Sequence, residues 1–161
     1  MTAPSPPGRL LLVPTPLDHG CTPQAPITDV LPLGTLQAAA RITHWISENA
    51  KSTRAFLKRV DAVAPLAQPV QAHTITELPR AVHKKGDHDP TSSLADARPL
   101  LAAAMQGQDV GLVSEAGMPA VADPGSSVVR AAHDAGAPVV PLVGPVSLLL
   151  ALAASGLNGQ H

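Results

Sequence analysis

Three short segments of the sequence combine proline with glycine or other small residues. They are PTPLDHG at 14–20, SEAGMPAVADPG at 114–125 and GPVS at 144–147, and each follows a run rich in apolar residues. Proline stiffens the backbone, whereas small side chains let a ligand approach it closely. One such segment is as easily a plain turn between two elements. Three of similar composition indicate the walls of a ligand-binding cleft.

Carboxylates and basic side chains lie near these segments. Glu48 and Glu115 are the carboxylates nearest the predicted cleft, and a carboxylate at a strand end is more often an orienting or helix-capping group than a base. A basic cluster follows the first of them: Lys51, Arg54, Lys58 and Arg59. These residues could contact a phosphate-bearing substrate, and a solvated helix face explains them at least as well.

The sequence gives little support for a metal site or for a glycine-rich loop that binds phosphate. One cluster has ligand-type side chains: His83, Asp87, His88 and Asp89. Its spacing fits no standard site, so no metal is expected there. The first predicted strand is followed by neither G-x-G-x-x-G nor G-x-x-x-x-G-K-[ST], so a ligand in the cleft is not expected to be held by its phosphates. Cys21 has no evident activating partner.

The elements that must position these loops alternate along the chain. Apolar and β-branched runs predict strands at 10–13, 42–47, 70–76, 109–114 and 138–142, and apolar periodicity predicts helices at 27–41, 51–60, 92–106, 126–135 and 146–155. This alternation is typical of an α/β fold with a parallel sheet, helices on both faces and right-handed crossovers. The apolar last helix is expected in the core or at an interface. In such a sheet, ligands bind outside the carboxyl ends of the strands, where the three loops fall.

Composition restricts the function classes. The 161 residues suit one domain, and 11 basic against 12 acidic residues give a net charge of −1, which is no general footprint for nucleic acid. One tryptophan, one phenylalanine and no tyrosine argue against binding single strands by aromatic stacking. A single cysteine, no signal-peptide pattern and no apolar run of membrane-spanning length predict a cytoplasmic protein without membrane attachment.

Two long motifs then carry a resemblance. VSEAGMPAVADPG, followed by VVPLVGPVSLLLALAASGL, resembles the S-D-A-G-T-P-x-x-x-D-P-G and V-P-x-P-G-P-S-A-x-x-x-A-L-x-x-S-G-L motifs of the tetrapyrrole methylase superfamily. Within it, the small-subunit rRNA (cytidine-2′-O)-methyltransferase branch is most similar. VPTPLDH at 13–19 is similar to its A-T-P-I-G-N, and SENAKSTRAFL at 47–57 to its A-E-D-T-R-x-T-R-x-L-L. Glu115 and Met118 stand where the family has Asp and Thr, and 49–51 where the branch has Asp-Thr-Arg.

The resemblance implies an S-adenosylmethionine-dependent methyltransferase, usually a homodimer, with RNA as a possible substrate. It implies a three-layer αβα domain at 9–157, the amino-terminal half of the family fold, followed at 158–161 by the start of a linker to a second domain. The composition of residues 1–8, rich in Pro, Ser and Gly, predicts a flexible tail. No catalytic residue is assigned. The residues that would face the cofactor are Pro14, Thr15, Pro16, Leu17, Asp18, Ser114, Glu115, Ala116, Gly117, Met118, Pro119, Asp123, Gly144, Pro145, Val146 and Ser147.

Other readings stay open. The altered motif positions would also fit a non-catalytic, dimerising scaffold that keeps the methylase fold. A tetrapyrrole C-methyltransferase is a further alternative, disfavoured by the ribosomal-type motifs. A nicotinamide oxidoreductase is disfavoured by the missing glycine fingerprint. Binding of labelled cofactor separates the enzyme from the scaffold.

Overall fold

A five-stranded, all-parallel sheet forms the centre of the protein. The computed structural model describes residues 3–18, 20–79, 95–122 and 124–160. The strands are β1 (Leu10–Val13), β2 (His44–Ser47), β3 (Thr74–Glu77), β4 (Val110–Val113) and β5 (Val139–Pro141), in the order β3-β2-β4-β1-β5. Every pairing is parallel, as the alternation of elements predicts.

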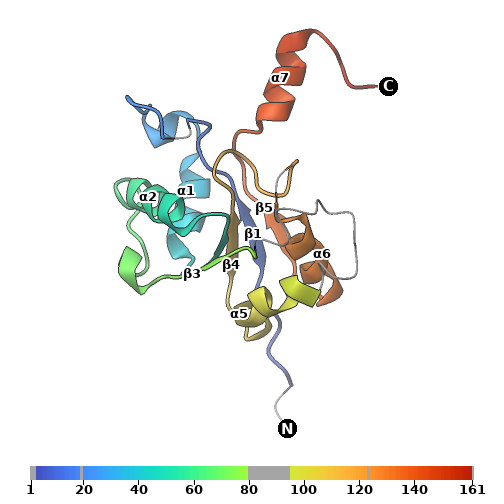
Figure 1. The fold of residues 1–161 in the computed structure, drawn as a ribbon. Helices are drawn as coiled ribbons and strands as arrows, with labels where there is room; N and C mark the ends of the chain where they lie inside the picture. Colours follow the sequence, from blue (N-terminus) through green and yellow to red (C-terminus); the bar gives the residue numbers. More distant parts are fainter. Residues whose placement is uncertain (1–2, 19, 80–94, 123, 161) are drawn as a thin grey trace.

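Helices cover both faces of the sheet (Figure 1). One face carries α1 (Leu33–Arg41) and α2 (Ala50–Asp61), and the other carries α5 (Ala102–Met105) and α6 (Ser126–Asp134). Successive strand residues serve opposite faces: Leu11 and Val13 pack in the core with α1 and α2, whereas Leu10 packs in the core with α5 and α6. The α/β three-layer prediction is confirmed.

The central strands are buried because both faces are covered. All of β4 is buried, and β1 is buried except for the partly exposed Leu12. A Cβ at Gly111 would lie 2.6 Å from Cε3 of Trp45, so the glycine makes room for the tryptophan on the neighbouring strand. Trp45 is 1% exposed. The largest side chain of the chain therefore packs at the middle of the sheet.

Three predicted elements differ in their bounds because proline ends or shortens them. The helix predicted at 27–41 begins only at Leu33, after Pro32, and a 3₁₀ turn covers Ile27–Asp29. The strand predicted at 70–76 is a 3₁₀ turn over Val70–Ala72, preceded by Pro69, followed by β3. Proline fixes its own φ near the helical value and offers no N–H, which suits the start of a turn.

The helix predicted at 92–106 is broken in its described part. A helical turn at 95–97 passes into a 3₁₀ helix over Arg98–Leu101 and then into α5. Pro99 lacks the N–H that a continuous α-helix needs at that point. Ala97, Leu101 and Ala104 still face the core as their periodicity predicts, whereas Met105 is exposed. Ser92 and Leu94 lie outside the described residues.

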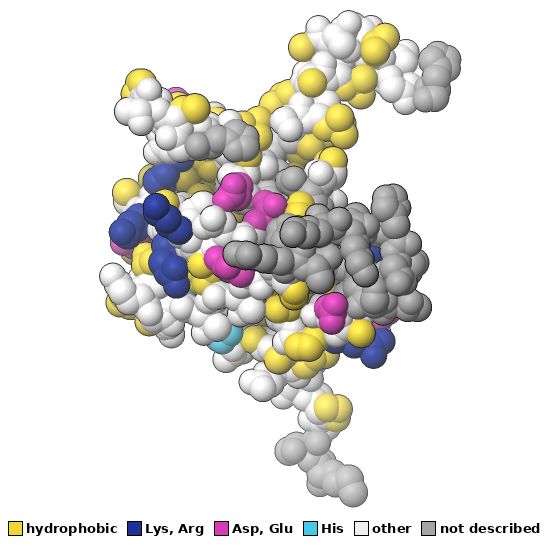
Figure 2. Space-filling view, in the orientation of Figure 1, with side chains coloured by type: hydrophobic (Ala, Val, Ile, Leu, Met, Phe, Trp, Pro, Cys, Tyr) yellow, Lys and Arg dark blue, Asp and Glu magenta, His cyan; other side chains and the backbone are white. Residues whose placement is uncertain are grey.

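The last helix, α7 (Ser147–Ser155), projects from the sheet (Figures 1 and 2). Of the two places expected for it, the core is therefore wrong for this chain, and an interface stays a prediction. None of its residues is buried, and Leu148, Leu149 and Leu150 are 56–59% exposed. A helix that is apolar on all sides has no polar face to give to water. Among the described residues, no helix is long and apolar enough to cross a membrane.

Candidate functional site

The three proline-containing loops meet at the carboxyl end of the sheet. They follow β1, β4 and β5, and β1 lies between the other two strands. Thr15 and Gly117 exchange two backbone hydrogen bonds, from Thr15 N–H to Gly117 O at 3.1 Å and from Gly117 N–H to Thr15 O at 3.0 Å. Gly144 packs against the Pro14 ring, where a Cβ would have no room. The loops are thus joined by backbone contacts rather than by long side chains.

The loop after β4 is shaped by its own polar side chains. The Ser114 hydroxyl donates to the carbonyl oxygens of Ala116 and Gly117, at 3.2 and 3.4 Å. The Thr15 hydroxyl donates to the Ser114 carbonyl oxygen at 3.3 Å. Ser114 and Thr15 are buried, so these hydroxyls have left water and need such partners. Both side chains therefore serve the shape of the loop.

Glu48 holds the same loop from the neighbouring strand. It follows β2, and its Oε2 accepts a hydrogen bond from the backbone N–H of Glu115 at 2.9 Å. An ionised acceptor makes this bond stronger than one between neutral groups. Glu48 therefore has the orienting role that its place at a strand end indicates. The Glu115 carboxylate in turn accepts from the Ser52 hydroxyl at 3.4 Å.

Two hollows lie on either side of the joined loops. The first, called here the β4–α7 hollow, has a volume of about 630 Å³ and is formed by the loops and by α7. Glu48 and Glu115 are the charged side chains in its described lining, and no cation lines it. The rest of the described lining is Leu17, Ala116, Gly117, Met118, Val121, Ala122, Val146, Ser147, Leu148 and Ala151. Its size lies within the range of about 300–1,000 Å³ typical of ligand pockets.

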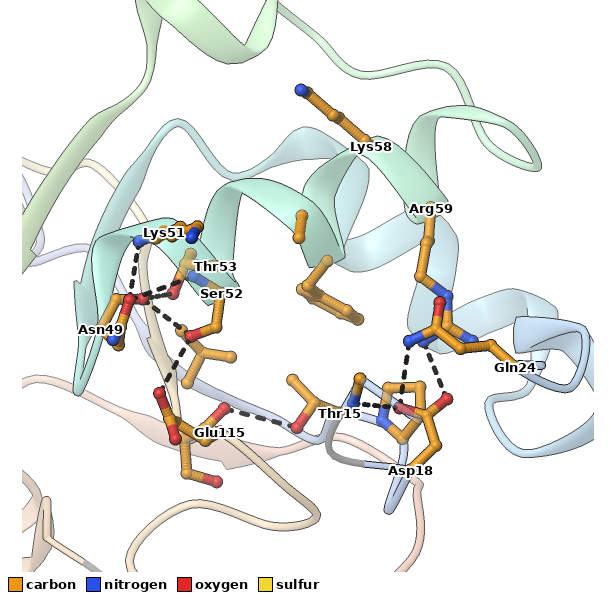
Figure 3. Close-up of a pocket in the computed structure, with 16 residues that line it drawn as sticks. Thr15, Asp18, Gln24, Asn49, Lys51, Ser52, Thr53, Lys58, Arg59 and Glu115 are labelled. Carbon is orange, nitrogen blue, oxygen red and sulfur yellow. Dashed lines mark hydrogen bonds and ion pairs between the residues drawn. The ribbon is translucent and has the colours of Figure 1, made fainter. Parts of the chain in front are cut away.

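The second, called here the α2 hollow, has a volume of about 700 Å³ and lies between α2 and the loop after β1 (Figure 3). Lys51, Lys58 and Arg59 come from the helix, and Asp18 and Glu115 from the loops opposite it. Arg59 Nη1 lies 3.0 Å from Asp18 Oδ2, and its Nη2 donates to the Ala25 carbonyl oxygen at 3.0 Å. Arg59 thus fixes this loop to the helix.

The residues predicted to face a cofactor are divided between the two hollows. The β4–α7 hollow receives Leu17, Glu115, Ala116, Gly117, Met118, Val146 and Ser147. The α2 hollow receives Thr15, Pro16, Asp18, Ser114 and, again, Glu115. Neither lining includes Pro14, Pro119, Gly144 or Pro145. Asp123 lies outside the described residues.

Several residues of the α2 hollow were not singled out as site residues from the sequence. Asn49 caps α2, since its Oδ1 accepts from the N–H groups of Lys51 and Ser52 at 2.9 and 3.2 Å. Asparagine before an amphipathic run is a known capping signal, so the sequence pattern could have predicted this role. Gln24 lines the hollow from a segment far along the loop after β1, and no local pattern signals that placement.

The metal-type cluster at 83–89 lies outside the described residues. Within residues 3–18, 20–79, 95–122 and 124–160, no group of three potential metal ligands comes together. Cys21 is exposed and unpaired.

Comparison with known proteins adds a second line of evidence. No family model matches the chain. A protein of Xylella fastidiosa named Ribosomal RNA small subunit methyltransferase I is 30% identical over 162 residues, covering 98% of this chain and 48% of the relative. A protein of the same name from Micromonospora olivasterospora is 33% identical over 154 residues, covering 96% of this chain and 41% of the relative. Over nearly its whole length the chain is thus similar to members of the tetrapyrrole methylase family, of which it covers only part.

The similarity to Ribosomal RNA small subunit methyltransferase I is higher over shorter stretches. The protein of that name from Escherichia coli O157:H7 is 46% identical over 65 residues, which are 40% of this chain and 23% of the relative. The matched stretches cover less than half of each of these three relatives. The family uses S-adenosylmethionine.

Proposed function

We propose that this chain is the cofactor-binding part of an S-adenosylmethionine-dependent methyltransferase that methylates a ribose 2′-hydroxyl of ribosomal RNA. The observation that carries the proposal is the β4–α7 hollow, built by the same loops that resemble the family motifs. The names of the relatives support the reaction type and the RNA substrate.

The chemistry of the hollow fits a positively charged sulfonium ligand. Two carboxylates, Glu48 and Glu115, are the charged groups of its described lining, next to apolar side chains and the backbone of 116–118. A cation is favoured beside carboxylates in a partly apolar hollow, where the effective dielectric constant is lower than in water. We assign Leu17, Met118 and Val146 to contacts with the apolar parts of the sulfonium ligand.

The bound cofactor would supply an activated methyl group, so the main task of this chain is alignment. The methyl group would pass from the sulfonium sulfur to the ribose 2′-oxygen, leaving a neutral thioether, and the hydroxyl proton would pass to solvent. Fixing two reactants in line can contribute about 7–11 kcal/mol. The backbone pairing of Thr15 with Gly117 and the hydrogen bond from Glu115 to Glu48 give this part of the fold the rigidity that alignment requires.

A titration calorimetry experiment tests the proposal. S-adenosylmethionine is titrated into the 161-residue chain and, as the positive control, into the Escherichia coli relative. Saturable binding to the chain is expected, and a Glu48→Ala variant is expected to bind more weakly because it loses both a negative charge and the anchor of the loop. Heats for the chain that do not exceed dilution, with binding to the control, would contradict the proposal.

One observation favours the alternative of a dimerising scaffold. The apolar residues of α7 are exposed, and an exposed apolar patch marks an interaction surface. The scaffold predicts self-association without cofactor binding. The same titration, combined with sedimentation analysis, therefore separates the two functions.

A further inference from the structure

The outer face of α2 is basic, and its inner face is apolar. Phe56, Leu57 and Val60 are buried against the sheet, whereas Lys51, Arg54 and Lys58 are exposed. Spacings of three and four residues place these three cations along one side of the helix. Figure 2 shows Lys and Arg side chains gathered over α2. For the rest of this section, the basic face means Lys51, Arg54 and Lys58.

Within the described part of the chain, no acidic side chain forms an ion pair with the basic face. The described residues form two ion pairs, Arg9 with Asp109 and Arg59 with Asp18. The second pair uses the remaining cation of α2 to hold the loop, and the basic face makes no ion pair with any residue in the described ranges. Like charges at these spacings lower helix stability slightly, so a polyanionic ligand would relieve a repulsion that the free protein carries.

The backbone N–H groups at the amino terminus of α2 do not form an anion site, because side chains of the protein already accept their hydrogen bonds. Glu77 Oε1 accepts from the Ala50 N–H at 2.8 Å, and Asn49 Oδ1 accepts from the next two N–H groups. An anion in this region would therefore be bound by the long, mobile side chains of the basic face. Such side chains suit a backbone of repeated phosphates better than one fixed anion.

The wall of the α2 hollow opposite Lys51 and Lys58 offers hydrogen-bond acceptors. Figure 3 shows Glu115 and Asp18 across the α2 hollow from the helix, and Ser52 beside Glu115. A ribose 2′-hydroxyl can donate to a carboxylate, and this group lets a protein distinguish RNA from DNA. Glu115 also lines the β4–α7 hollow, so the two hollows share one wall.

Base stacking has no platform here. Trp45 and Phe56 are the chain's aromatic residues, and both are buried, at 1% and 6% exposure. A strand bound at this surface would be held through its backbone, so its affinity should depend strongly on salt and weakly on sequence.

From this arrangement we infer that the basic face of α2 binds the phosphate backbone of a single RNA strand, with a ribose hydroxyl at Glu115 across the α2 hollow. The inference rests on the proposed function and assigns the surface that holds the RNA substrate. The two hollows then place cofactor and acceptor on either side of Glu115.

Fluorescence anisotropy with a short, labelled single-stranded RNA tests the inference. Each phosphate contact on a single strand contributes about −0.7 to the slope of log affinity against log salt, so three contacts predict a slope of about −2 between about 50 and 200 mM KCl. The triple variant Lys51→Gln, Arg54→Gln, Lys58→Gln should lose most of this slope and bind on the order of tenfold more weakly or worse. An unchanged slope in a folded triple variant would overturn the inference.

Two controls complete the design. Arg41→Gln removes an exposed cation at the end of α1, whose charge acts on Asp109 just before the start of β4, and should leave RNA binding unchanged. A DNA strand of the same sequence should bind more weakly than the RNA, and Glu115→Ala should reduce that difference. Equal or tighter binding of the DNA to the unmodified chain would overturn the assignment to RNA.

The test separates this inference from the proposed function. None of the three cations lines the β4–α7 hollow, so the triple variant should bind S-adenosylmethionine as the unmodified chain does. Cofactor binding without RNA binding would overturn only the inference about α2. Absence of cofactor binding in the unmodified chain would instead contradict the proposed function.

Discussion

Thr15 and Gly117 form a two-hydrogen-bond bridge between the loops that follow β1 and β4. The loop after β5 closes on the same point, since the Pro145 carbonyl oxygen lies beside Gly117. Three chain segments far apart in sequence are thereby fixed at one edge of the sheet. This contact gives the two hollows a common, rigid boundary.

Gly117 should tolerate no side chain. Its φ is +72°, and a Cβ would lie 2.9 Å from Leu17 Cδ2 and 3.2 Å from the Pro145 oxygen. We expect Gly117→Ala to lower the free energy of unfolding by about 1–2 kcal/mol, from backbone conformation alone, with any steric cost in addition. Urea denaturation measures this. The matched control is Gly34→Ala in α1, where an added Cβ would meet no atom within 4 Å outside its own helix backbone; this change should stabilise by about 0.5–1 kcal/mol. Equal effects of the two changes would contradict the prediction.

The single tryptophan should report on a buried hydrogen bond. Trp45 Nε1–H donates to His73 Nδ1 at 3.1 Å, and His73 Nε2 lies 3.0 Å from the Gln68 carbonyl oxygen. Because indole can only donate, Nδ1 must accept, and the proton sits on Nε2. His73→Leu should therefore cost about 1–3 kcal/mol of stability, since it leaves a buried N–H unsatisfied.

His73→Gln is the matched control for this bond, because an amide oxygen can still accept from Trp45. It should retain more stability than His73→Leu, and tryptophan emission during denaturation follows both variants. A leucine variant as stable as the glutamine variant would show that the bond contributes nothing.

The loop after β4 stores backbone strain. Ala120 and Ala122 have φ values of +64° and +52°, a region that residues with a Cβ adopt at a cost of about 1–2 kcal/mol. Ala120→Gly should remove that cost and leave the protein equally stable or up to about 1 kcal/mol more stable, after the entropy of glycine is subtracted. Ala55→Gly, in the exposed interior of α2, should destabilise by about 0.5–1 kcal/mol. Thermal unfolding compares them, and loss of stability in both would refute stored strain.

The pairing of Arg9 with Asp109 should make stability fall in acid. The hydrogen bond from the Arg9 side chain lowers the pKa of Asp109 below its ordinary value of 3.8. A carboxyl whose pKa is lowered on folding contributes stability above its unfolded pKa and loses it as pH falls through the folded value. The loss should therefore occur below about pH 4. The side chains are 50% and 35% exposed, so less than about 1 kcal/mol is expected.

A double-mutant cycle isolates that contribution. The coupling between Arg9→Gln and Asp109→Asn, measured by urea denaturation, should be favourable at neutral pH and vanish in acid. A coupling that does not change with pH would contradict the assignment.

The sheet was predictable because its signals are local. Apolar or β-branched runs predict every strand, and their alternation with helices predicts the parallel topology. The predicted bounds of two helices were wrong because a proline begins or interrupts the helix, as at Pro32 and Pro99. The exposure of α7 could not be predicted from its composition, since an apolar helix looks the same whether covered or bare.

The sequence predicts which loops meet at the candidate site. It does not predict how their residues are divided between the β4–α7 hollow and the α2 hollow. The small residues around Gly117 predicted a cleft, and the family motifs supplied candidate site residues, of which Pro14, Pro119, Gly144 and Pro145 line neither hollow. In the loop after β1, Leu17 lines one hollow and Asp18 the other, and the Arg59–Asp18 pair holds Asp18 against α2. That contact joins residues 41 positions apart, and no local pattern encodes it.

The measurement that tests the central claim most directly is calorimetric titration of S-adenosylmethionine into three proteins: the unmodified chain, Gly117→Ala and Gly34→Ala. We predict saturable binding at one site per chain, weakened or lost with Gly117→Ala and retained with Gly34→Ala. Absence of binding to the folded, unmodified chain, or equal binding to all three, would contradict the claim that the joined loops form the cofactor site.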